Sequence, residues 1–165
     1  MNLSAKSIVI LISGRGSNLE ALLKSSLPGK VAAVISNRPE AQGLQIAQSY
    51  GVDAAAVDHK AYPSREDFER ALIEAIDRYR PDLVALAGFM RILTDGFVAH
   101  YPGRLINIHP SLLPAFPGLH THAQALAAGV KIHGCTVHFV TSRLAHGPIV
   151  IQAAVPVLPE DTEDA

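Results

Sequence analysis

Residues 86–122 read LAGFMRILTDGFVAHYPGRLINIHPSLLPAFPGLHTH, and they decide the fold prediction. This stretch contains an apolar run that ends in glycine and a second run, Leu105–His109, that carries two polar side chains. Those side chains, Asn107 and His109, are two residues apart and therefore project from one face of a strand. Burying an amide and an imidazole costs free energy unless each finds a partner. A proline-rich loop, residues 110–117, follows at once. Open α/β sheets bind ligands at this end of their strands, so we expect a ligand site here.

The rest of the chain alternates between short apolar runs and segments with helical spacing. The run SIVILI, residues 7–12, is rich in β-branched residues and is typical of a strand buried on both faces. Ser64 predicts the start of a helix, with Asp67 as a weaker form of the capping box. This alternation predicts right-handed βαβ units in an α/β fold with a mainly parallel sheet, and the last two strands pair antiparallel at one edge. The expected strands are 7–12, 31–36, 54–57, 83–87, 104–108, 134–141 and 149–157, and the expected helices are 19–25, 41–50, 64–80, 94–101 and 121–128.

Composition narrows the class of protein. The chain has 165 residues, which suits one domain, and a net charge of −1, which predicts no nucleic-acid partner. No apolar run is long enough to cross a bilayer, and the amino end lacks the layout of a signal peptide, so we expect no membrane partner. A single cysteine, Cys135, excludes an intrachain disulfide and favours a cytoplasmic location; it is expected to be buried in a strand.

A glycine-rich loop, SGRGSN at residues 13–18, follows the first predicted strand and precedes a helix. Backbone N–H groups and the positive helix end make such a loop an anion site. It lacks the Gly-Lys-Ser/Thr of a P-loop, and Leu19 stands where a dinucleotide-binding loop has its third glycine. The loop therefore predicts a phosphate on a small substrate; the alternative is a tight turn capped by Asn18.

Other polar residues favour ordinary structural roles. Asn107 and His109 are either a pair satisfied by backbone groups or a catalytic pair. Met90–Leu93 either line an apolar ligand slot or belong to the core or to the start of a helix. Ser13 and Ser111 lack the motif of a serine nucleophile. The five histidines between residues 120 and 146 match no metal-binding spacing, so we expect no metal: His120, His122, His133, His138 and His146.

The chain resembles the folate-dependent formyltransferases nearly end to end. The matching motifs are ISGRGSN, LAGFMRIL, NIHPSLLPAFPGLHTH, GCTVHFVT and HGPIVIQAAVPV. The resemblance implies a Rossmann-like formyltransferase fold with a mainly parallel central sheet, helices on both faces and an antiparallel edge. It also implies formyl transfer from 10-formyltetrahydrofolate to the amine of glycinamide ribonucleotide in de novo purine biosynthesis, without a metal. Two related enzymes fit less well and are not expected here: formyltetrahydrofolate deformylase carries an additional regulatory domain and methionyl-tRNA formyltransferase carries a tRNA domain.

The same resemblance assigns roles to particular residues. Asn107 would stabilise the oxyanion and His109 would act as general acid, while the Leu113–Pro114 bond would be cis. The phosphate of the ribonucleotide would be held by Gly16, Ser17 and Asn18. The folate would be contacted by Arg65, Met90, Arg91, Ile92, Leu93, Asn107 and Thr141, with residues 141–145 as one wall of its slot.

Two departures from the family pattern stand out. Ala145 occupies the position of a family Asp that supports proton transfer through the histidine, and Ser142 replaces a common acidic residue. An alanine accepts no hydrogen bond, so slower catalysis is expected. The acidic end, PEDTEDA, reads as a helix start without a helix body, so a single domain 1–165 without its C-terminal helix is expected.

Three alternatives stay open. The departures motivate a non-catalytic folate- or nucleotide-binding pseudoenzyme, and the other two are a deformylase-like hydrolase and a generic phosphate-binding regulatory module. Either a monomer or a homodimer is compatible with the sequence.

Overall fold

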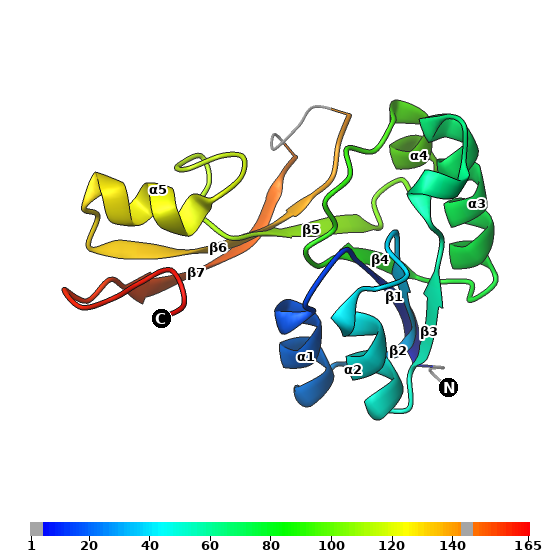
Figure 1. The fold of residues 1–165 in the computed structure, drawn as a ribbon, viewed down its shortest axis with the longest axis horizontal. Coiled ribbons are helices and arrows are strands. Elements are labelled where there is room, and N and C mark those ends of the chain that lie inside the picture. The colour runs from blue at the N-terminus through cyan, green and yellow to red at the C-terminus, as the bar shows by residue number, and fades with distance from the viewer. Residues whose placement is uncertain (1–4, 143–146) are drawn as a thin grey trace. The chain divides into compact units, whose positions relative to one another are not determined.

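The computed structural model describes residues 5–142 and 147–165, and its contacts divide the chain into two compact units (Figure 1). The first unit is Met1–Ile106 and the second is Asn107–Ala165. Strand β5 (Leu105–His109) begins in the first unit and ends in the second. The single domain expected for residues 1–165 stays a prediction.

Parallel strands form the centre of the first unit. Ile10 of β1 lies opposite Val34 of β2 and Ala85 of β4, and β2 in turn pairs with β3. Successive residues of β1, Ile10 and Leu11, are at most 1% exposed, so this strand is buried on both faces as its composition predicted. The strands, in the order β3-β2-β1-β4-β5, are β1 (Lys6–Ile12), β2 (Gly29–Ser36), β3 (Asp53–Ala56), β4 (Leu83–Leu86) and β5.

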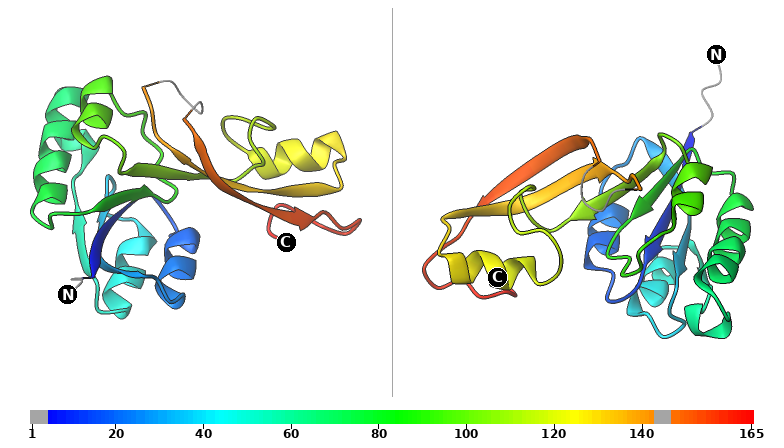
Figure 2. Two further views of the ribbon diagram at one scale, coloured as in Figure 1. Left: turned by 180° about the vertical axis from the view of Figure 1, so that it is seen from behind. Right: turned by 90° about the horizontal axis from the view of Figure 1, so that it is seen from above.

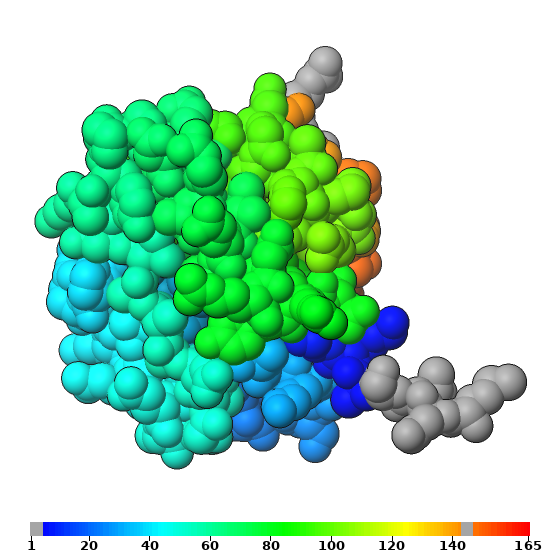
Figure 3. All heavy atoms as spheres, turned by 90° about the vertical axis from the view of Figure 1, so that its right-hand side faces the viewer, coloured from blue at the N-terminus to red at the C-terminus, as the bar shows by residue number. Residues whose placement is uncertain are grey.

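Helices cover both faces of these strands. Helices α1 and α2 lie on one side and α3 on the other (Figures 1 and 2), and Figure 3 views the unit from the side of α3 and α4. As predicted, Ser64 caps α3: its hydroxyl accepts a hydrogen bond from the Asp67 N–H at 3.1 Å. Phe68, Leu72 and Ile76 form the buried stripe of α3. The helical segments are α1 (Ser17–Lys24), α2 (Gln42–Ser49), the 3-10 turn η1 (His59–Ala61), α3 (Arg65–Asp77) and α4 (Asp95–His100).

The second unit contains the end of β5, helix α5 (Thr121–Ala128), and strands β6 (Ile132–Phe139) and β7 (Ile149–Pro156). Strands β6 and β7 pair antiparallel, which confirms the predicted edge. Cys135 lies in β6 as expected but is half-buried rather than buried. Its partner in the register is Ala153 of β7, a strand whose residues are all exposed, so this edge of the sheet covers Cys135 only in part.

The α/β fold with a mainly parallel sheet is therefore confirmed. Within the described ranges, no helix has the length and apolar character needed to cross a membrane.

A close backbone approach fixes the loop after β1. Gly16 has a φ of 78°, and a Cβ built on it would lie 2.8 Å from the Cα of Gly43 in α2. The Gly43 N–H also donates to the Gly14 carbonyl at 3.1 Å. A side chain at residue 16 would therefore push two backbone segments apart.

We predict that Gly16→Ala lowers the free energy of unfolding by more than Gly51→Ala does. Gly51 has a similar φ of 71° but no heavy atom within 4 Å of the added Cβ, so it is the matched control. The left-handed conformation alone costs an alanine about 1–2 kcal/mol, and the clash with Gly43 adds to that cost only at Gly16. Urea unfolding of both variants measures the difference, and equal losses would contradict the prediction.

Candidate functional site

The loop between β1 and α1 presents the amino end of a helix to solvent. Helix α1 begins at Ser17, and its N-cap is Gly16 in the left-handed conformation, so Asn18 is not the cap that the alternative of a tight turn assumed. Ser17 and Asn18 are exposed in the first turn, whose N–H groups have no acceptor within the helix. These N–H groups and the helix dipole favour an anion at this point.

The segment after β4 displays apolar side chains on the surface. Met90 is 69% exposed and Ile92 is 56% exposed, so the interpretation of these two residues as core is wrong. Arg91 is half-buried, and its guanidinium carbon lies 5.9 Å from the ring centroid of Phe68 in α3. Arg65, the first residue of α3, is exposed. The residues expected to hold phosphate and most of those expected to contact the folate thus belong to the first unit.

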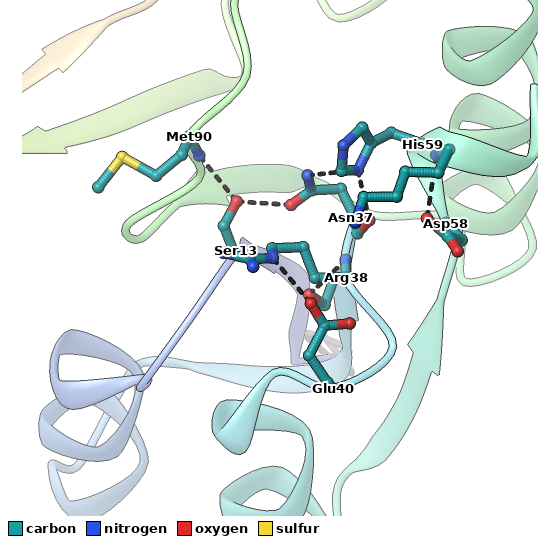
Figure 4. A network of polar contacts seen from close by, with 9 residues as sticks. Ser13, Asn37, Arg38, Glu40, Asp58, His59 and Met90 are labelled. Atoms are coloured by element: carbon teal, nitrogen blue, oxygen red, sulfur yellow. Dashed lines mark hydrogen bonds and ion pairs between the residues drawn. The ribbon is translucent and has the colours of Figure 1, made fainter.

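Two buried polar residues, Ser13 and Glu69, bond to this segment, and a third, Asn37, bonds to Ser13; sequence reasoning missed all three. Ser13 and Asn37 lie next to one another at the ends of β1 and β2 (Figure 4), and Glu69 lies in α3. Ser13 bonds to Met90 and Glu69 bonds to Thr94. One signal was present in the sequence. Ser13 and Asn37 each come directly after a buried strand, and ligand sites of parallel sheets lie at such strand ends.

Asn107 is held by a partner that also fixes which way its amide points. His138 Nδ1 lies 3.0 Å from the Phe139 carbonyl, which only accepts, so this nitrogen carries the ring proton. His138 Nε2 is then an acceptor, and Asn107 Nδ2 donates to it at 3.3 Å. The pair therefore leaves one hydrogen of the Asn107 amide available as a donor.

His109, on the same strand, is held by the loop that follows. Its Nε2 lies 3.2 Å from the Phe116 carbonyl, so Nε2 carries the proton in that hydrogen bond. Phe116 adopts a positive φ of 50°, and the expected cis Leu113–Pro114 bond is confirmed in the same loop. Asn107 and His109 are both half-buried and both partnered.

The remaining predicted residues lie near the loop between β6 and β7. Thr141 and Ser142 are exposed in the second unit. Ala145 and His146 lie outside the described residues.

Two histidines of the second unit pair with each other. His122 Nδ1 lies 3.0 Å from His133 Nε2, and His133 is 8% exposed. Within the described part of the chain, His133 Nδ1 is a buried side-chain nitrogen without a hydrogen-bond partner. Burial, and then the neighbouring His122, lower the pKa of His133 below its usual value. Among residues 5–142 and 147–165, no three His, Cys, Asp or Glu side chains gather into a group that could hold a metal ion.

Comparisons with known proteins agree on one family. The family model described as formyl transferase matches residues 6–165. Phosphoribosylglycinamide formyltransferase of Escherichia coli is 53% identical over 161 residues, which cover 95% of this chain and 76% of that protein. A crystal structure of glycinamide ribonucleotide transformylase 1 from Symbiobacterium toebii has a TM-score of 0.92 and 51% identity, and the match covers 99% of this chain and 79% of that one. The trifunctional purine biosynthetic protein adenosine-3 of Drosophila melanogaster is 48% identical over 97% of this chain, which spans 12% of that protein.

We predict that His133→Leu reduces the loss of stability on acidification. The native pKa of His133 is lowered, so as pH falls below about 6.5 the unfolded chain takes up a proton that the native chain resists. Stability therefore falls with pH in this window, and the variant should show a shallower fall in urea-unfolding free energy between pH 7 and pH 5. His120→Asn, which removes an exposed imidazole from the same unit, is the control. Parallel curves for His133→Leu and the unmodified chain would refute this account.

Proposed function

The chain belongs to the formyl transferase family, and from that premise we propose that it transfers the formyl group of 10-formyltetrahydrofolate to the amine of glycinamide ribonucleotide, a step of purine biosynthesis. The observation that carries this proposal is the pair on β5. Asn107 is an oriented amide donor, and His109 is a held imidazole two residues away. An oriented donor beside a proton carrier is what acyl transfer to an amine requires.

The amine nitrogen of the ribonucleotide attacks the formyl carbon, and the carbonyl oxygen takes on negative charge. The remaining hydrogen of the Asn107 amide then donates to this oxyanion. Because His138 already holds the amide, little reorganisation accompanies the charge. Removing one such donor costs about 100- to 1,000-fold in rate.

Collapse of the tetrahedral intermediate breaks the bond between the formyl carbon and N10 of the folate. One proton leaves the attacking amine and one proton arrives at N10, so the transfer is balanced without another reactant. His109 carries this proton, a role that contributes about 100- to 10,000-fold. The Phe116 carbonyl holds the ring orientation through Nε2.

Binding roles follow the exposed groups of each unit. In the first unit, the N–H groups of Gly16–Asn18 bind the phosphate, while Arg65 and Met90–Leu93 contact the folate. In the second unit, Thr141 contributes to folate binding. The exposed apolar surface of Met90 and Ile92 suits a flat heterocycle.

One observation favours a second candidate, a non-catalytic binding protein. The family Asp is replaced by Ala145, which removes a carboxylate from the proton-transfer network. Such a chain would bind the ribonucleotide and the folate but turn them over slowly.

We expect the full chain to form formylated ribonucleotide from both substrates, and His109→Ala to lower kcat by about 100- to 10,000-fold. The absorbance of the released tetrahydrofolate product, checked by mass spectrometry of the ribonucleotide, follows the reaction. His100→Gln, which changes an exposed histidine of α4, is the matched control and should keep the parent rate. Formate release without an amine acceptor would instead support a hydrolase, and an unchanged rate in His109→Ala would remove the proposed mechanism.

We also predict that Ala145→Asp raises kcat by about two to four orders of magnitude, because it restores a carboxylate that supports the histidine. Ala145→Asn, which is similar in size but cannot carry the charge, is the control and should give a much smaller gain. Stopped-flow or steady-state assays at saturating substrates make the comparison. If the aspartate and asparagine variants gain equally, the effect is not electrostatic.

A further inference from the structure

The segment Met90–Thr94 combines exposed apolar side chains with a backbone that is anchored at both ends. Exposure of single apolar residues is common on proteins and needs no special account. The anchoring is the informative feature, because both anchors are buried polar side chains from distant parts of the first unit. Burying a polar group costs free energy unless it is hydrogen-bonded, so hydrogen bonds to the segment offset the cost of burying these two side chains.

The first anchor is a directed chain of hydrogen bonds. The Met90 N–H only donates, and it lies 2.8 Å from the Ser13 hydroxyl oxygen, which therefore accepts. The Ser13 hydroxyl then donates to Asn37 Oδ1 at 2.5 Å (Figure 4). Ser13 is 3% exposed and Asn37 is 2% exposed, so water does not compete for these bonds. The start of the segment is thus tied through β1 to the end of β2.

His59 holds Asn37, which is the last residue in this series of hydrogen bonds. The ring Nδ1 lies 2.9 Å from the Asn37 main-chain oxygen and 3.2 Å from the Asn37 side-chain Nδ2. One nitrogen cannot donate and accept at once. The carbonyl only accepts and lies closer, so Nδ1 carries the proton and donates to it. The His59 N–H donates to the same oxygen at 3.3 Å, which fixes the peptide that positions the amide.

The second anchor is a buried carboxylate. Glu69 of α3 is 3% exposed, and its Oε1 accepts from the Thr94 N–H at 2.8 Å. Its Oε2 accepts from the Thr94 hydroxyl. The Thr94 oxygen in turn accepts from the Phe97 N–H at 3.3 Å and caps α4. The end of the segment is therefore fixed together with the start of a helix.

We propose that Ser13, Asn37 and Glu69 are positioning residues that hold the Met90–Thr94 backbone in the conformation that receives the folate. This inference rests on the proposed function of the segment as a folate contact. Fixing a backbone has an entropy cost that a ligand must otherwise meet when it binds. The two anchors fix this backbone during folding. Met90 and Ile92 therefore already have their binding positions before the ligand binds.

The test compares folate binding with backbone protection in the full chain. The probe is 5-formyltetrahydrofolate, titrated by calorimetry into the parent chain, Asn37→Ala and Glu69→Ala. We expect each variant to raise Kd about tenfold, the loss expected for one missing hydrogen bond. Amide hydrogen exchange should be faster at Met90 in the first variant and at Thr94 in the second. Gln48→Ala in α2 and Glu74→Ala in α3, which change exposed residues, are the matched controls and should leave both readouts unchanged.

Two further readouts separate positioning from a loss of structure. Glu69→Gln keeps an oxygen acceptor for the Thr94 N–H, so it should recover most of the affinity lost in Glu69→Ala. Binding of glycinamide ribonucleotide to Glu69→Ala should stay at the parent value, whereas general unfolding would weaken both ligands. If folded variants bind the probe as tightly as the parent chain, the positioning proposal is wrong. If the parent chain itself does not bind the probe, the proposed function fails first, and the two failures are thereby distinguished.

Discussion

Polar groups buried at the carboxyl ends of parallel strands must find partners within the protein, and the first unit is built around that requirement. Ser13 meets it twice. Its N–H donates to the Gly88 carbonyl at 3.1 Å, and its hydroxyl joins Met90 to Asn37. Three strands, β1, β2 and β4, are thereby connected beyond their ladder bonds. Removing one partner of these hydrogen bonds would leave the other partner buried and unpaired, because water cannot reach it to take the missing partner's place.

The same requirement connects two candidate binding segments through one residue, Ser13. Ser13 is the first residue of the glycine-rich loop, and it also bonds to both Gly88 and Met90 after β4. The loop is held from its other side by the close approach of Gly43 in α2. The hydrogen bonds that stabilise the strand ends therefore also hold the two surfaces for which we propose ligand binding. Exposed N–H groups and exposed apolar side chains thus belong to a backbone that buried hydrogen bonds hold in place.

The second unit uses a comparable device on a smaller scale. The Phe139 carbonyl sets the tautomer of His138, the tautomer sets the amide of Asn107, and the Phe116 carbonyl orients His109. Backbone carbonyls thus control which side-chain groups donate. The proposed mechanism also calls for a negative charge from an Asp at position 145, and the alanine there cannot supply it. Orientation of the side chains and negative charge contribute separately to the proposed mechanism, and this chain has the residues that orient Asn107 and His109.

Local patterns in the sequence predicted where the strands, the helices, the cap at Ser64 and the glycine-rich loop lie, because each of these depends on neighbours a few residues apart. They also pointed to Asn107 and His109, whose spacing on a strand is a local property. The Ser13 anchor could not be read in this way. Ser13 meets Asn37 across 24 residues and Met90 across 77, and Glu69 meets Thr94 across 25. Only tertiary structure decides such contacts, because a buried polar group bonds to whichever partner the packing of strands and helices brings within reach.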